Sequence, residues 1–545
     1  MFHSIQEVLT AHQFEVKGGL AAAGLVMVFV YYVLERLHVR RFRWIPGILL
    51  AVLAAGSVFA YAEFGRLRFG TYLNPHDVFH YYMGAKYSEE TNYFNLYRCS
   101  LIADWEQKKV YHEKVIRNLE THVCNEDAHS VLAKAETYKQ PFTPARWEAF
   151  KKDILYFQSL VPGWKWNDML KDKGYNATPV WNSVARFLTE RVATDNWWGM
   201  ALLIAIDPIL LLLMFATLWW AFGWRTTLFA VIFFGTSYMT AFPHIKGAFL
   251  RMDWVAFLVM GVCLVKKDKY KLAGALMAYS AMARVFPAIF LYGLGARCFF
   301  RGVRHAYDFA RTRKLVSWSE QDKRYVAFFV TFVVVSVALV GLTRFYEGDF
   351  QRWESFSKKI VVHNNDISTT RVGFKYIFLW PVKGFGEKSV VFDQQQNVWR
   401  LILLGVLLVG LVGVFRIEDY EAIAYGFVPA FFLAAPTFYY YVMLIVVVLL
   451  FIPKLDRFPR AVGGAGLFGI TVAAFALNGF MPMAFDFCFW LSCILLGLVC
   501  YMVLVCAFAG RAVAEECGPE KIDETKNETM EKKTTRSAAS RRKRR

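Results

Sequence analysis

The chain has 545 residues, of which 56% are hydrophobic and 17% aromatic, and its mean hydropathy is +0.32. This composition excludes an ordinary soluble globular protein, which has no use for so much apolar surface. The formal net charge of +19 would suggest a nucleic-acid partner in a soluble protein, but Lys and Arg concentrate in short segments between apolar runs and in the tail, as in membrane proteins. We therefore expect membrane lipids, and no nucleic acid, as partners of the basic residues.

Long apolar runs predict membrane-spanning helices, because lipid offers the backbone no hydrogen-bond partner. The predicted spans are 19–34, 45–62, 199–221, 225–241, 253–265, 270–283, 285–297, 325–343, 399–415, 421–437, 439–452, 461–478 and 485–508. The predicted fold is therefore an all-α polytopic membrane protein with about thirteen transmembrane helices. The spans around 253–297 are short and Pro243 and Pro287 lie at or inside helix ends, which predicts broken helices there.

Basic loops predict the orientation of the spans. The loops 35–44, 266–271, 297–324 and 453–460 alternate to one side, which the positive-inside rule assigns to the cytoplasm. The predicted regions are two transmembrane helices (1–62), a long extracytoplasmic loop (63–198), a transmembrane core (199–343), a second extracytoplasmic loop (344–398), C-terminal transmembrane helices (399–510) and a basic disordered cytoplasmic tail (511–545). The short loop 242–252 falls on the same outer side as the two long loops.

The first long loop is predicted to be helical. Asn74-Pro75, Thr143-Pro144 and Thr178-Pro179 each place a capping residue before proline, so short helices should begin there. Cys99 and Cys124 both lie in this loop, and an outer location is compatible with either a disulfide between them or two free thiols.

The segment Asn74–Tyr87 carries the most informative pattern. A helix beginning at Pro75 would place Asp77, His80 and Tyr81 on one face, with Gly84 leaving a gap for a ligand. Two other interpretations remain open from the residues alone. Asp77 in the first turn suits the helix dipole, and the aromatic residues suit the membrane interface.

Two segments resemble one family of enzymes. The run DVFHYYMGAKYSEETNYFNLYRC (Asp77–Cys99) resembles the first-loop motif of GT-C glycosyltransferases that use polyprenyl-phosphate sugars, particularly glycosyltransferase family 87. The segment 246–297, with KGAFLRMDW and KYKLAGALMAYSAMARVFPAIF, resembles the middle of that family. The likeness covers roughly residues 45–450 and its motifs are short.

The resemblance implies a GT-C fold and an inverting sugar transfer without a cofactor or metal, on the outer face of a bacterial inner membrane. The donor would be a polyprenyl-phosphate sugar and the acceptor a lipid or glycan. Asp77 matches the acidic residue that takes a proton from the acceptor hydroxyl, which is general base catalysis. His80, Tyr81 and Lys86 of the same segment are candidate substrate contacts.

Basic residues of the outer loops are candidates to bind the donor phosphate. These are His244, Lys246, Arg251, Arg284, Lys358, His363, Arg371 and Lys375. The lysines could instead reach lipid headgroups, and His363 could be a solvated loop histidine. Asp253 is expected to pair with Arg251 or Arg284, and a second acid near the site is the alternative.

Three further interpretations compete with these. A secondary transporter or lipid flippase would carry inverted repeats and paired broken helices, and the sequence shows no such repeat. A ligase or polymerase of lipid-linked polysaccharide would use a diphosphate-linked donor. The aromatic run Phe438–Tyr441 fits an interface belt better than a sugar platform.

Overall fold

The computed structural model describes residues 2–38, 44–66, 71–241, 246–314, 317–347, 350–365, 367–481 and 484–516. Helices dominate these residues, and their one sheet is a two-residue antiparallel ribbon of β1 (Val115–Ile116) and β2 (Glu126–Asp127). Seven of the described helices are long and apolar enough to cross a membrane. The predicted class, an all-α membrane protein, is confirmed, whereas the predicted count of thirteen spans is not.

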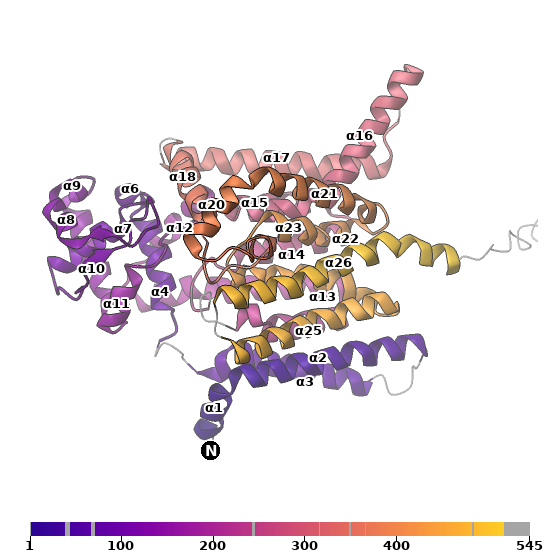
Figure 1. Ribbon diagram of the computed structural model, residues 1–545, viewed down its shortest axis with the longest axis horizontal. Coiled ribbons are helices and arrows are strands. Elements are labelled where there is room, and N and C mark those ends of the chain that lie inside the picture. The colour runs from indigo at the N-terminus through magenta and orange to yellow at the C-terminus, as the bar shows by residue number, and fades with distance from the viewer. Residues whose placement is uncertain are drawn as a thin grey trace, which may run out of the picture.

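Most of the long helices run nearly parallel in one bundle, and α4 to α12 gather at one end of it (Figure 1). The long helices are α2 (Gln13–Arg36), α3 (Trp44–Tyr61), α13 (Trp197–Thr236), α17 (Glu320–Glu347), α21 (Gln396–Val414), α25 (Phe458–Phe480) and α26 (Phe485–Glu516). The other helices of the bundle and its connections are α1 (Phe2–Ala11), α14 (Asp253–Lys266), α15 (Tyr270–Ala283), α16 (Tyr292–Thr312), α18 (Gln351–Asn365), α19 (Phe374–Phe378), α20 (Phe385–Gln394), α22 (Asp419–Ala424), α23 (Phe427–Leu433) and α24 (Leu444–Phe451). Short 3₁₀ turns are η1 (Glu63–Gly65), η3 (Tyr238–Thr240), η5 (Phe286–Leu291), η6 (Phe438–Met443) and η7 (Ile452–Lys454).

The element α13 contains two antiparallel arms. Gly223 interrupts it with a φ of 80°, which a residue with a side chain rarely adopts. The ring centroids of Phe215 and Phe234 lie 5.7 Å apart, although a straight helix would separate their positions by about 28 Å. The predicted spans 199–221 and 225–241 are therefore the two arms, and the second arm ends at Thr236.

The middle of the bundle is broken, as the proline pattern predicted. α14 and α15 have 14 residues each, or about 21 Å, which is shorter than the hydrocarbon core. α15 ends where Arg284 adopts an extended backbone, and Pro287 then begins the 3₁₀ turn η5. The predicted spans 421–437 and 439–452 are likewise divided, into α22, α23, η6 and α24.

Ion pairs gather the predicted cytoplasmic loops at one end of the bundle. Arg225 contacts Glu35 at 2.5 Å, Arg324 contacts Asp268 at 2.8 Å, and Lys266 and Lys454 each contact Glu418 at 2.8 Å. These loops therefore lie together, away from α4 to α12 (Figure 1). Which side of a membrane they occupy stays a prediction. α26 continues to Glu516, beyond the predicted start of the tail at 511, and residues 517–545 lie outside the described residues.

The first long loop is folded, as predicted. Asn74, Thr143 and Thr178 cap α4, α10 and α12 with their side chains, and proline occupies the first turn of each helix. The elements are α4 (Pro75–Val78), the π-turn η2 (Phe79–Met83), α5 (Gly84–Lys86), α6 (Ser88–Thr91), α7 (Leu96–Trp105), α8 (Ala128–Ala133), α9 (Ala135–Lys139), α10 (Pro144–Ser159), α11 (Gly163–Met169) and α12 (Pro179–Thr189). α12 joins the loop to the bundle, because Trp181 Nε1 donates to the Leu250 carbonyl and Thr178 Oγ1 to the Met282 carbonyl.

Cys99 and Cys124 do not form a disulfide, which decides between the two alternatives that the sequence left open. Cys99 and Cys124 are both free thiols, and Cys99 Sγ lies 3.7 Å from the Tyr138 carbonyl oxygen. Cys99 is a buried residue of α7, and a buried thiol behaves as a small apolar group.

Close packing between α15 and α17 generates a prediction about stability. A Cβ on Gly274 would lie 2.3 Å from the Phe328 carbonyl oxygen, whereas a Cβ on Gly341 of α17 meets nothing within 4 Å. Gly274→Val should therefore lower the melting temperature of the purified protein in detergent by several degrees, since backbone cannot move aside cheaply. Gly341→Val is the control and should change it little. Equal melting temperatures for the two variants would contradict this packing.

Candidate functional site

The predicted helix start at Asn74-Pro75 places Asp77 at the boundary between loop and bundle. Asn74 Oδ1 accepts from the backbone N–H of Asp77, and the backbone N–H of Asn74 donates to the Gly247 carbonyl at 2.6 Å. These contacts fix the first turn of α4 against the segment 246–252. The Asp77 carboxylate then forms an ion pair with Arg251, with 2.9 Å between Oδ2 and Nε.

Arg251 is held from the bundle side by a second carboxylate. Asp207 of α13 accepts hydrogen bonds from the backbone N–H groups of Arg251 and Met252 at 2.9–3.1 Å. The guanidinium lies over the ring of Tyr81, 4.1 Å from its centroid. Its Nη1 is buried and makes no hydrogen bond within the part of the chain that the structure describes.

Asp77 lines a cavity of about 520 Å³ between α4, the loop after α11, the segment after α18 and the 3₁₀ turn η6. Its walls are polar and aromatic, and they come from segments far apart in the sequence. The lining residues are Asn74, His76, Asp77, His80, Tyr81, Lys165, Asp172, Lys173, Gly174, Asn176, Arg251, His363, Ser368, Thr370, Thr437, Phe438, Tyr439 and Tyr440. We call this space the Asp77 cavity.

Burial sets the protonation of the acid and of two histidines in this cavity. Burial raises the pKa of Asp77 above its ordinary value, and the positive charge of Arg251 opposes that rise only in part. Burial lowers the pKa of His80 to about 4, and it holds the pKa of His363 well below its usual value, with the charge of Arg371 adding to the effect. Both imidazoles are therefore neutral at pH 7.

Arg284 lies near the same tyrosine ring as Arg251. Its guanidinium is 5.3 Å from the ring of Trp181 and 5.8 Å from the ring of Tyr81, and it donates to the adjacent Ala283 carbonyl. Among the described residues no carboxylate lies within 4.0 Å of it, although only 7% of the residue is exposed, and the charge of Asp253 acts on it from beyond that distance. A buried arginine without a direct carboxylate contact is costly, so this position carries a positive charge that packing alone does not require.

The predicted partner for these arginines is wrong. Asp253 is fully buried, and its oxygens accept from the backbone N–H of Trp254 and from the hydroxyl of Tyr279. Neither Arg251 nor Arg284 pairs with it within 4.0 Å. Asp253 therefore caps the first turn of α14 and does not line the Asp77 cavity.

Several other predicted contacts lie away from this cavity. Lys86 points into the loop region, where it pairs with Asp153 at 2.7 Å. Lys358 is exposed and pairs with Glu354 one turn earlier at 2.7 Å. Arg371 and Lys375 are buried side by side against Tyr376, and Arg371 Nη2 donates to the His363 carbonyl, so this pair shapes the wall behind His363. His244 lies outside the described residues.

The predicted gap at Gly84 is also wrong. A Cβ there would lie 2.5 Å from Tyr175, so the tyrosine ring already fills the space. The π-turn η2 changes the helical register between Asp77 and Gly84, and His80 and Tyr81 remain on the cavity side.

Lys246 belongs to a second, mostly apolar cavity of about 520 Å³. Its ammonium pairs with Glu63 at 2.6 Å, and the buried Lys17 lies 3.6 Å from the same Glu63 oxygen. Apolar residues of α3 and of both arms of α13 line most of this space, including Val58, Leu211, Leu212, Phe215, Val231 and Phe234. We call it the α3–α13 groove, and the segment 246–252 borders both the groove and the Asp77 cavity.

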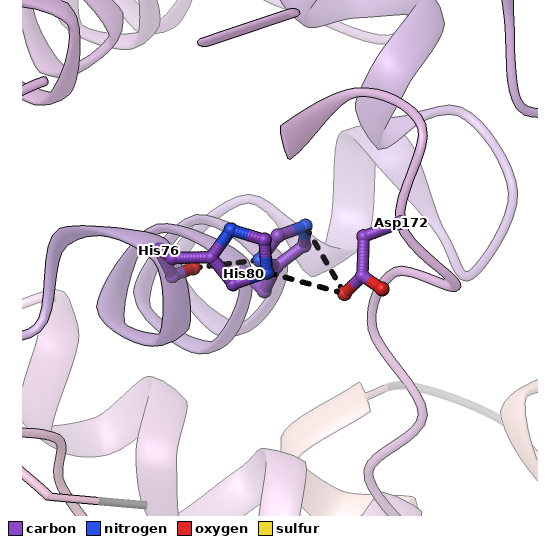
Figure 2. Close-up of side chains that lie close together, drawn as sticks. All are labelled: His76, His80 and Asp172. Atoms are coloured by element: carbon purple, nitrogen blue, oxygen red, sulfur yellow. Dashed lines mark hydrogen bonds and ion pairs between the residues drawn. The ribbon is translucent and has the colours of Figure 1, made fainter. Parts of the chain in front are cut away.

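Sequence reasoning missed the aromatic and acidic parts of the Asp77 cavity. Tyr439 and Tyr440 line it, so the prediction of a lipid-facing belt at Phe438–Tyr441 is wrong. Asp172 and Lys173 come from the loop after α11, where Gly174 with a φ of 70° marks a tight turn. His76, Asp172 and the neighbouring His80 are the described histidine and acidic residues close enough together to hold a metal ion (Figure 2).

No protein-family model, curated protein or solved structure matches the chain.

The environment of Arg284 generates a prediction about stability. Arg284→Met removes a buried charge that has no acidic partner, so the melting temperature should stay the same or rise. Arg297→Met is the matched control, because Arg297 is equally buried but pairs with Asp419 and donates to the carbonyls of Val414 and Ile417. That variant should lose about 3–5 kcal/mol of stability, since Asp419 is left uncompensated. Thermal unfolding in detergent compares the two, and a large loss for Arg284→Met would show that Arg284 serves packing.

Proposed function

We propose that the protein is an inverting membrane glycosyltransferase that moves a sugar from a polyprenyl-phosphate donor to a lipid or glycan acceptor on the outer face of a bacterial inner membrane. The observation that supports this most is the position of Asp77. One buried carboxylate with a raised pKa lines a polar cavity at the end of a membrane bundle, and two buried arginines lie near the ring of Tyr81 next to it.

The reaction needs one base and a positive environment for the leaving group. The acceptor hydroxyl oxygen attacks the anomeric carbon of the sugar, and the bond from that carbon to the lipid phosphate oxygen breaks. Asp77 takes the hydroxyl proton, and a single displacement inverts the anomeric configuration. Burial raises the affinity of Asp77 for a proton, which suits a general base better than an exposed carboxylate would.

Arg251 and Arg284 would stabilise the departing phosphate. Arg251 already pairs with Asp77, and its buried Nη1 has no protein partner among the described residues, so a phosphate oxygen could accept from it. Among the described residues Arg284 has no carboxylate within 4.0 Å, and it adds a second positive charge 5.8 Å from the Tyr81 ring that Arg251 also contacts. In a low-dielectric site such fixed charges act strongly on the negative charge that develops on the leaving phosphate.

The α3–α13 groove offers a place for the donor's polyprenyl chain. Its apolar lining comes from α3 and α13, and Lys246 and Arg66 lie on its border. Because the segment 246–252 contributes to both cavities, a lipid seated in the groove would carry its phosphate toward Arg251. The apolar polyprenyl chain would thus contact the apolar lining of the groove, and the charged phosphate would contact the polar lining of the Asp77 cavity.

Asp77→Asn tests the base. The side chain keeps its shape but cannot accept a proton as a carboxylate does, so transfer from labelled polyprenyl-phosphate sugar in membrane vesicles should fall about 100-fold or more. The variant should still be recovered folded from detergent. Asp195→Asn is the control, because Asp195 is an exposed acid of the same loop that pairs with Lys152. Full activity in Asp77→Asn would remove Asp77 from the reaction, and vesicle uptake of a substrate without any transfer would favour a transporter.

Arg251→Gln tests the electrostatics through pH. Asp77 can accept a proton only as a carboxylate. The value of kcat/KM should therefore be highest above the pKa of Asp77 and should decrease as the pH falls through that pKa. Because Arg251 lowers that pKa, Arg251→Gln should move the acid limb of the profile to higher pH. Arg284→Gln should move it less, since the charge of Arg284 has a smaller effect on Asp77. An unshifted acid limb in Arg251→Gln would show that another group limits the rate.

A further inference from the structure

One wall of the Asp77 cavity brings together three side chains of the kinds that ligate metals. His76 and His80 lie one helical turn apart on α4 and η2, and Asp172 faces them from the loop after α11 (Figure 2). His76 Nε2 is 3.4 Å and His80 Nε2 is 4.0 Å from the same Asp172 oxygen. Ligand atoms of the three residues all lie within 4.8 Å of one another, which small side-chain movements would bring to the spacing around a bound ion.

The hydrogen bonds of His80 prepare one of its nitrogens for an ion. Its Nδ1 lies 2.7 Å from the His76 carbonyl oxygen and its Nε2 lies 3.2 Å from the Met169 carbonyl oxygen, and the shorter contact favours the proton on Nδ1. Nε2 then presents its lone pair toward Asp172 and the Tyr97 hydroxyl, which is 2.7 Å away. Metal-ligating histidines commonly have this arrangement, with the second ring nitrogen donating to a backbone carbonyl. The Tyr97 hydroxyl is the group that a metal would displace from Nε2.

We propose that His76, His80 and Asp172 bind one divalent transition-metal ion at the cavity wall. Two imidazoles and one carboxylate suit Zn²⁺, Mn²⁺, Fe²⁺ or Co²⁺, whereas Mg²⁺ and Ca²⁺ prefer sites made of oxygen ligands alone. Three protein ligands leave further coordination positions open, and these face a cavity also lined by Asp77 and Lys173.

This proposal reaches beyond the glycosyl transfer proposed above and does not depend on it. The sequence predicted no metal, because its acidic residues near Asp77 lack the paired spacing of a metal site. Asp172 lies far along the chain, and only the fold of the loop brings it to the two histidines. A bound cation here would add positive charge to the wall that faces the two arginines, where phosphate or diphosphate oxygens could complete its coordination.

Binding of Co²⁺ to the full-length protein tests the proposal, because Co²⁺ is a spectroscopic probe for such sites. Protein purified in detergent and treated with a chelator should bind one Co²⁺ per chain, with visible absorption bands that added Zn²⁺ removes. His76→Ala and Asp172→Asn should weaken Co²⁺ binding at least about tenfold. Both side chains are partly exposed, so these variants should fold, whereas His80 is buried in the loop core.

His129→Ala is the matched control, because His129 is an exposed histidine in α8 of the same loop region and should leave Co²⁺ binding unchanged. The proposal is overturned if the wild-type protein shows no saturable Co²⁺ or Zn²⁺ binding, or if binding persists in both His76→Ala and Asp172→Asn. A lower melting temperature for Asp172→Asn without any metal binding would identify a structural His–Asp contact only. Loss of metal binding with full transferase activity would separate this site from the role of Asp77.

Discussion

The ion pair between Asp77 and Arg251 joins the two parts of the molecule. Asp77 belongs to the folded first loop and Arg251 to a short segment between α13 and α14, and both side chains are buried. Removing either partner would leave an uncompensated buried charge, at a cost of about 3–5 kcal/mol. The pair therefore fixes α4 over the end of the bundle, and the Asp77 cavity exists because this contact holds its two sides in place. Asp207 strengthens the arrangement by binding the backbone on which Arg251 is carried.

The same contact fixes the boundary between the polar Asp77 cavity and the apolar α3–α13 groove. The segment 246–252 separates a cavity with histidines, lysines and acids from a groove lined by α3 and α13. Tyrosine rings contact the charges on the polar side, and both Arg251 and Arg284 lie near the ring of Tyr81. Aromatic faces attract guanidinium groups and exclude water, so the charges remain strong in their effect on any ligand that enters.

Individual residue roles were harder to predict than the elements that carry them. Lys86 and Asp77 lie on one short helical segment, yet Lys86 contacts Asp153 while Asp77 faces the cavity, because positions nine residues apart point to opposite sides of a helix. Gly84 was expected to leave a gap, but Tyr175, distant in sequence, fills it. Tyr439 and Tyr440 look like interface residues in a hydropathy pattern, and they line the cavity because η6 turns inward beside Thr437.

The sequence by itself determined the membrane class, most of the long helices and the proline-marked helix starts at 75, 144 and 179. Hydropathy and capping are local properties, so a single chain displays them directly. Only the tertiary structure decided that Asp77 pairs with Arg251, that Arg284 has no acidic partner among the described residues, and that Asp172 meets His76 and His80. Those contacts join residues far apart in the chain, and they depend on how the loop folds back onto the bundle, which periodicity and charge patterns do not encode.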